Sequence, residues 1–344
     1  MNHPPRTAYV VAGPHRSGTS LVAGLLGNSV GVLPTDLMRP ALSNAKGFNE
    51  SWSIVHFNES IFREIGLTWD SIEPTGKQIL KESFKKRFYS NCLDCLRANF
   101  PESAKNESES IVLKDPRFCR TFPIWKKALL DLRYEIKVVI PLRSPVDVMH
   151  SLMKRDEIDS ASAVLIWYWH IVEILIHTEG MDISFIFYDQ LLDNPPEHMR
   201  MSLNIEISDS VASIIDRKLN HSKNSESPTQ TFLEDEPFHA SMMLYENLLN
   251  SSSPDSQMVL AVKSSYFFNH VLKSNIERKS TALHKRLIRE ISILNGLPVR
   301  ENEKRFKSVN SLDHSISSDS SEIEEKRSKN TSKFYKLWNL FKNP

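Results

Sequence analysis

The chain has 344 residues, and its 43 lysines and arginines nearly balance its 42 aspartates and glutamates, which gives a formal net charge of +1. This balance argues against a partner recognised by overall charge, such as nucleic acid or an anionic membrane, so any preference for anions must be local. Three cysteines in a chain of this length exclude a disulfide framework. The length predicts about two domains, with a core large enough for an open sheet.

The N-terminal residues lead directly into the first predicted strand, without the charged and then apolar pattern of a secretory signal. No uninterrupted apolar stretch approaches the roughly 20 residues that cross a bilayer. We therefore expect the protein to be cytoplasmic.

Short apolar, β-branched runs alternate with longer helical patterns in the N-terminal part of the chain. The predicted strands lie near residues 8–12, 111–114, 136–140 and 183–188, and the predicted helices near 18–29, 121–132, 145–155 and 160–179. This alternation predicts an α/β three-layer fold with a central parallel sheet flanked by helices. A ligand would bind at the carboxyl ends of the strands. The residues between 52 and 110 read as helical and would cap this cleft.

The turn after the first predicted strand has the composition of a phosphate-binding loop. It reads Gly13-Pro14-His15-Arg16-Ser17-Gly18-Thr19-Ser20 and opens into a helical stretch, which makes the fold P-loop-type. The first N–H groups of such a helix are unpaired and attract an anion, while glycines let the backbone approach it. Thr19 stands where ATP-hydrolysing loops carry a lysine, and the nearest cation is Arg16, inside the loop. This departure argues against an ATPase or a kinase.

With Arg16 followed by Ser17, Gly18, Thr19 and Ser20, the loop resembles the phosphosulfate loop of sulfotransferases that use 3′-phosphoadenosine 5′-phosphosulfate (PAPS). The resemblance implies that these five residues form the cofactor-binding loop. Thr19, Ser20 and the loop N–H groups would hold the 5′-phosphate. Arg16 would stabilise the charge that builds on the leaving phosphate during sulfuryl transfer.

Residues 43–50 resemble the N-x-K-G-[YF]-x-E stretch of a bacterial, carbohydrate-sulfotransferase-like branch of this superfamily. The resemblance makes Glu50 the candidate general base that takes the proton from the acceptor hydroxyl. His56 is the rival base, because an unperturbed histidine titrates near neutrality. The residue types also fit a solvated loop carboxylate and a surface histidine, so they leave the choice of base open.

The second predicted strand ends in Lys114-Asp115-Pro116-Arg117. A Mg²⁺ site for ATP needs a carboxylate at such a strand end, but Asp115 stands between two cations and is expected to pair with a neighbour such as Arg117. The turn matches the K-D-P-[RF] sequence of several sulfotransferase branches, and this resemblance implies that Lys114 faces the sulfuryl group. No cluster in the sequence has metal-ligand spacing, so no metal is expected.

The third predicted strand runs into Arg143, and a helix that begins near Pro145 carries Ser151 eight positions after the arginine. Sulfotransferases hold the 3′-phosphate of the nucleotide with an arginine and a serine at this spacing, in an R-x-P-x-D-x-x-x-S type of stretch. The resemblance implies the same role for Arg143 and Ser151. An arginine at the end of a buried strand otherwise needs a carboxylate partner, since an unpaired buried charge is very costly.

The domain organisation follows from where the strand signals end. We assign residues 1–210 to a sulfotransferase-like P-loop core and residues 211–307 to a helical extension. Residues 308–332 are rich in Ser, Asp, Glu and Lys and are predicted to be a disordered linker. The tail, residues 333–344, mixes aromatic residues with lysines, which fits either peripheral contact with the inner membrane or docking onto protein.

Together these motifs predict a PAPS-dependent sulfotransferase that moves a sulfuryl group onto a hydroxyl, with a carbohydrate or a lipid-linked glycan as the favoured acceptor. PAPS is the expected co-substrate, with no metal and no nucleic-acid partner. One alternative is a P-loop nucleoside or sugar kinase that uses ATP, against which Thr19 argues. Another alternative is a non-catalytic module that binds a nucleotide.

Overall fold

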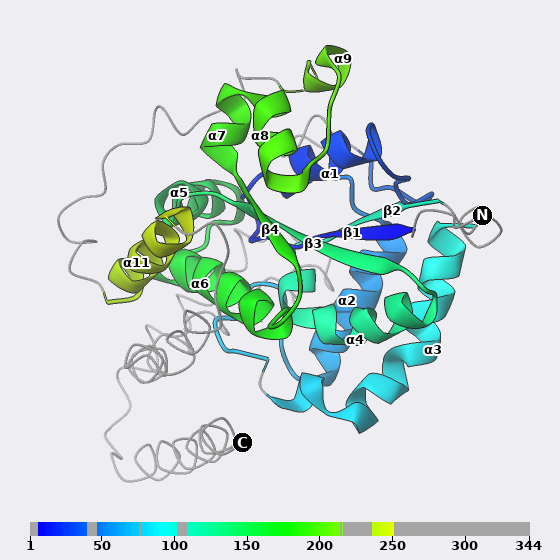
Figure 1. Cartoon of the computed structure of the whole chain (residues 1–344). Coiled ribbons are helices and arrows are strands. Elements are labelled where there is room, and N and C mark those ends of the chain that lie inside the picture. The colour runs from blue at the N-terminus through cyan, green and yellow to red at the C-terminus, as the bar shows by residue number, and fades with distance from the viewer. Residues whose placement is uncertain are drawn as a thin grey trace, which may run out of the picture. The chain divides into compact units, whose positions relative to one another are not determined.

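Four parallel strands form the central sheet in the described part of the chain (Figure 1). The computed structural model describes residues 6–39, 47–75, 77–101, 109–213, 215 and 236–250. The strands are β1 (Thr7–Val11), β2 (Ile111–Lys114), β3 (Glu135–Leu142) and β4 (Ile183–Phe187). All of the predicted strands are therefore confirmed.

The strand order is β2-β1-β3-β4, so the chain crosses from one side of β1 to the other between β2 and β3. Val11 at the end of β1 lies level with Lys114 of β2 and with Val139 of β3. Because the strands are parallel, their carboxyl ends meet at one edge of the sheet. In open α/β sheets, ligands bind at this edge, beside the strand where the order reverses. The loop after β1 lies at that point.

Helices cover both faces of the sheet (Figure 1). One face carries α1 (Thr19–Gly27), α7 (Tyr188–Asp193) and α8 (Pro195–Leu203), and the other carries α4 (Phe118–Asp131) and α6 (Ser160–His177). The remaining described helices are α2 (Trp52–Glu64), η1 (Lys77–Leu80), α3 (Glu82–Asn99), α5 (Pro145–Asp156), α9 (Asp209–Ala212) and α11 (Glu236–Asn250). The predicted fold class, an α/β fold with a parallel sheet flanked by helices, is confirmed.

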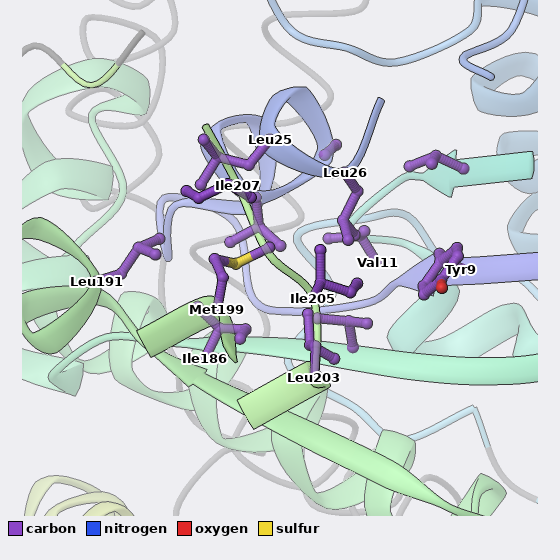
Figure 2. Close-up of a cluster of buried hydrophobic side chains, with 14 residues drawn as sticks. Tyr9, Val11, Leu25, Leu26, Ile186, Leu191, Met199, Leu203, Ile205 and Ile207 are labelled. Atoms are coloured by element: carbon purple, nitrogen blue, oxygen red, sulfur yellow. The ribbon is translucent and has the colours of Figure 1, made fainter. Parts of the chain in front are cut away.

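The face toward α1 is filled by a cluster of buried apolar side chains (Figure 2). Tyr9 and Val11 of β1 point into it, because side chains two apart on a strand share a face. The other members are Val22, Ala23, Leu25, Leu26, Val112, Val139, Ile186, Leu191, Met199, Leu203, Ile205 and Ile207. Burying each large aliphatic side chain contributes about 1.5–3 kcal/mol. This packing fixes α1 against the sheet and so fixes the loop between β1 and α1.

On the other face, α6 is apolar along its length and runs through the core. Trp167, Tyr168 and Trp169 are at most 3% exposed, as expected for a cluster that belongs to the core. By length and composition α6 is the one described helix apolar enough to cross a membrane, but most of it is buried inside the protein.

A buried ion pair joins α4 to α6. Arg120 Nε lies 2.8 Å from Glu173 Oε2, and the arginine side chain is fully buried. The same pair holds the loop that follows α2. Arg120 donates to the backbone oxygens of Ser71 and Glu73, and Glu173 accepts from the backbone N–H and the hydroxyl of Thr75. This loop is therefore tied to two core helices.

Only a small part of the C-terminal third belongs to the described residues. There α11 packs against α5 and α6, and the Tyr245 ring lies 6.4 Å from that of Trp167. The rest of the predicted extension (211–307), the linker (308–332) and the tail (333–344) lie outside the described residues. The boundary at residue 210 stays a prediction.

Glu173→Ala is expected to destabilise the protein by about 3–5 kcal/mol, because it leaves the charge of Arg120 buried without a counter-charge. Urea unfolding followed by circular dichroism measures this change. Glu82→Gln is the matched control, since it alters an ion pair whose carboxylate is exposed and is expected to change stability much less. Equal losses of stability in the two variants would contradict the role given to the buried pair.

Candidate functional site

Two glycines shape the loop between β1 and α1. A Cβ atom on Gly13 would lie 2.6 Å from the backbone oxygen of Pro141 in β3, so a larger residue does not fit without moving that strand. Gly18 has a φ of 87° and forms the N-cap of α1 without a side-chain cap. The N–H groups in the first turn of α1, which begins at Thr19, are therefore left for another acceptor. This geometry suits an anion.

Arg143 and Ser151 meet Arg16 at this loop. Arg16 donates from Nε to Ser151 Oγ on α5 at 2.8 Å. Arg143, which follows β3, donates from Nη1 to the backbone oxygen of Arg16 at 3.4 Å. Because Ser151 accepts from Arg16, its hydroxyl proton remains available to a ligand. The structure thus brings together three of the seven residues that the sequence predicts for the nucleotide.

Positive charge is concentrated at this loop. Burial lowers the pKa of the Arg16 guanidinium, and the charges of Arg155 and Arg143 lower it further. Arg143 is 9% exposed, with Asp147 Oδ2 3.7 Å from its Nε, and that Nε has no hydrogen-bond partner among the described residues. The buried hydroxyl of Ser17 also lacks one within the described part of the chain. Buried polar atoms are normally paired, so Arg143 Nε, beyond its ion pair with Asp147, and the Ser17 hydroxyl can each still donate to an acceptor.

A second charged group lies at the end of β2. Lys114, only 2% exposed, donates to the carboxylate of Glu50, to Ser20 Oγ at 3.2 Å and to the backbone oxygen of Phe48 at 3.1 Å. Arg117 Nη1 lies 4.0 Å from the other oxygen of Glu50. The structure therefore joins the predicted Glu50 and Lys114 to the phosphate loop through Ser20. Glu50 is a buried, paired carboxylate.

Asp115 is occupied by protein donors. It accepts from Asn58 Nδ2 at 2.8 Å and from the backbone N–H and Nη1 of Arg117, both at 3.0 Å, so the expected pairing with Arg117 is confirmed. Burial lowers the pKa of Arg117, but the carboxylates of Asp115, Glu59 and Glu50 raise it by more. Asp115 is therefore a structural carboxylate. Across the ranges described above, no three His, Cys, Asp or Glu side chains form a group that could hold a metal ion.

His56, the rival base, lies elsewhere on α2. Its side chain is exposed, and its ring packs 5.8 Å from the exposed ring of Trp52. The structure does not bring it to Lys114 and Glu50 by any contact among the described residues. Of the two candidate bases, Glu50 is the one that lies beside Lys114 and Arg117.

Two side chains that the motifs did not single out also face the loop. Tyr188, the first residue of α7, comes within 2.5 Å of the Cβ position of Gly18, and the Arg143 guanidinium lies 4.7 Å from its ring centre. Its position at the end of the fourth predicted strand is the signal that could have found it. His15 is buried inside the loop, where its bulk among small residues is the only sequence signal.

No family model and no curated protein matches this chain. Among solved structures, the sulfotransferase domain of the olefin synthase from Synechococcus PCC 7002 is 15% identical with a TM-score of 0.37, over 76% of this chain and 94% of that one. A sulfotransferase from Mycobacterium tuberculosis is 15% identical with a TM-score of 0.39, over 70% and 77%. The sulfotransferase domain from the curacin biosynthetic pathway is 15% identical with a TM-score of 0.34, over 76% and 98%.

Proposed function

We propose that this protein is a PAPS-dependent sulfotransferase. The observation behind this proposal is the meeting of Arg16, Arg143 and Ser151 at a phosphate-type loop that has threonine in place of the lysine of ATP-binding loops. The loop and the first turn of α1 suit one phosphate, and Arg143 with Ser151 suits a second. PAPS carries phosphate groups at both the 5′ and the 3′ positions of its ribose, which fits this pair of sites.

The residues present fit PAPS in their detail. Arg143 Nε has an ion-pair partner in Asp147 at 3.7 Å but makes no hydrogen bond in the described residues, nor does the buried hydroxyl of Ser17, and a phosphate oxygen is a strong acceptor for both. Thr19, Ser20 and the loop N–H groups would hold the 5′-phosphate, since they stand at the N-terminus of α1. PAPS, when bound, supplies a sulfuryl group attached to a phosphate leaving group.

The charges at the loop suit sulfuryl transfer. In that reaction negative charge moves onto the bridging oxygen of the leaving phosphate, and cations held in a partly buried site stabilise it. Arg16 and Lys114 are the cations that approach the loop, Arg16 from within it and Lys114 through its hydrogen bond to Ser20. Glu50 is the carboxylate beside Lys114, and we assign it the role of taking the proton from the acceptor hydroxyl.

The kinase alternative is less well supported by the same residues. ATP transfer relies on a loop lysine and on a carboxylate that holds Mg²⁺. Thr19 occupies the lysine position, and Asp115 is engaged by Asn58 and Arg117. The acceptor we propose is a carbohydrate hydroxyl, on the resemblance carried by residues 43–50. A cytoplasmic site of action and contact of residues 333–344 with a membrane also stay proposals.

Adenosine 3′,5′-bisphosphate is expected to raise the Tm of the protein without Mg²⁺, because the loop and Arg143 would each bind one of its phosphates. At a ligand concentration of 100 Kd the gain is about 2.7 kcal/mol. Thermal shift measures it, with Mg-ATP and 5′-AMP as parallel ligands. A protein stabilised by Mg-ATP and unaffected by the bisphosphate would contradict the proposal in favour of a kinase.

Arg143→Ala is expected to weaken binding of adenosine 3′,5′-bisphosphate at least tenfold, because a charge-assisted contact worth about 1.5–3 kcal/mol is lost. Isothermal titration calorimetry gives the Kd. The matched control is Arg63→Ala, which removes an exposed arginine at the end of α2. If the two variants bind the nucleotide equally well, Arg143 does not hold a phosphate.

Glu50→Gln is expected to leave nucleotide binding within about twofold and to lower turnover by about 10²–10⁴-fold, since the amide cannot take a proton. Transfer from labelled PAPS to lysate glycans measures turnover, and Glu64→Gln, which changes an exposed carboxylate at the end of α2, serves as control. Wild-type turnover in Glu50→Gln would move the base elsewhere, and the same assay on His56→Gln tests the rival residue.

A further inference from the structure

His15 is a buried loop residue with an unused hydrogen-bonding atom. Its side chain is 8% exposed, and its Nε2 has no hydrogen-bond partner among the described residues. The ring packs against Trp69, with 4.5 Å between centroids, and meets the ring of His170 edge-on at 5.5 Å. His15 thus projects toward α6 and the loop after α2, whereas its neighbour Arg16 reaches Ser151 on α5.

His170 has a matching unused atom. Its Nδ1 lies 2.7 Å from the backbone oxygen of Ile166, and because a carbonyl only accepts, Nδ1 carries the proton. Burial lowers the pKa of His170 to about 3, so the ring is neutral and its Nε2 is a bare acceptor. That atom is fully buried and also lacks a partner in the described residues. Two adjacent imidazoles thus each present a buried nitrogen that the described residues leave unpaired, which is rare in native cores.

His15 is connected through the loop to the group of charged residues around Glu50. Burial lowers its pKa, and the charges of Arg117, Arg155 and Lys114 lower it further. Arg117 and Lys114 are the cations that flank Glu50, the proposed base. His15 also lies in the same loop as Ser20, which accepts from Lys114, the cation paired with Glu50.

Trp69 and His170, whose rings contact that of His15, are held in fixed places. Trp69 lies in the loop that Arg120 and Glu173 tie to α4 and α6, and His170 stands one turn before Glu173 on α6. The Arg155 guanidinium also lies 5.9 Å from the Trp69 ring centre. A site built on anchored elements holds its geometry before a ligand arrives.

We propose that His15, Trp69 and His170 form the acceptor subsite, in which His15 Nε2 hydrogen-bonds the hydroxyl that receives the sulfuryl group and Trp69 contacts the carbon skeleton beside it. This inference rests on the proposed sulfotransferase function. A neutral imidazole matches a hydroxyl, which both donates and accepts a hydrogen bond.

The test compares His15→Leu, which removes the hydrogen bond, with His15→Gln, whose amide reaches toward the position of Nε2. Each full-length variant is given ³⁵S-labelled PAPS with water or lysate glycans as the hydroxyl source, and labelled products are counted. His239→Leu, an exposed histidine of α11, is the matched control. Calorimetry with adenosine 3′,5′-bisphosphate reports the nucleotide site separately, and thermal melts check folding.

The subsite predicts that His15→Leu lowers sulfuryl transfer at least tenfold, that His15→Gln recovers a large part of it, and that both bind the bisphosphate within about twofold of wild type. Wild-type transfer in His15→Leu, or equal losses in the two variants, would overturn the hydrogen-bonding role while leaving the proposed function intact. A tenfold loss of bisphosphate binding in His15→Gln would move His15 to the nucleotide site. A wild-type chain that binds no bisphosphate or transfers no label would refute the proposed function and the subsite with it.

Discussion

The hydrogen bond from Arg16 to Ser151 is the interaction on which the rest of the site depends, because it joins the loop after the first strand to the helix after the third. It holds one guanidinium in place beside a second, that of Arg143, in a partly buried region. Like charges in such surroundings repel, and the repulsion is relieved when an anion binds between or beside them. Asp147 offsets part of the charge of Arg143, and a phosphate bound beside the two guanidiniums would offset more of it.

The sheet makes this arrangement possible. Parallel strands deliver the loop after β1, Lys114 at the end of β2 and Arg143 after β3 to the same edge, and the reversal of strand order at β1 places the loop between the other two. Gly13 allows the loop to pass close to β3, and the apolar cluster beneath α1 keeps the helix N-terminus aimed at the loop. On the other face, the pair of Arg120 and Glu173 anchors the loop that carries Trp69.

The sequence was sufficient for the strands, the order of elements and the residues of the loop, because those depend on local apolar patterns and on short spacings. Arg143 and Ser151 were predicted from the resemblance carried by one eight-residue spacing, and the structure places both in contact with Arg16. The pairing of Lys114 with Glu50 was not accessible in this way, since it joins residues far apart in the chain through the folding of two loops. The two candidate bases differ in burial, since Glu50 is buried and His56 is exposed. Burial depends on the whole fold and cannot be read from a short motif. The orientation of His15 toward α6 also depends on tertiary packing.

A structure of the protein bound to adenosine 3′,5′-bisphosphate would test most directly whether the loop and Arg143 each hold one phosphate. We expect the 5′-phosphate to lie at the N-terminus of α1, within hydrogen-bonding distance of Thr19 and Ser20. The 3′-phosphate is expected to contact Arg143 and Ser151. A nucleotide whose 3′-phosphate points into solvent, away from both of those side chains, would contradict it.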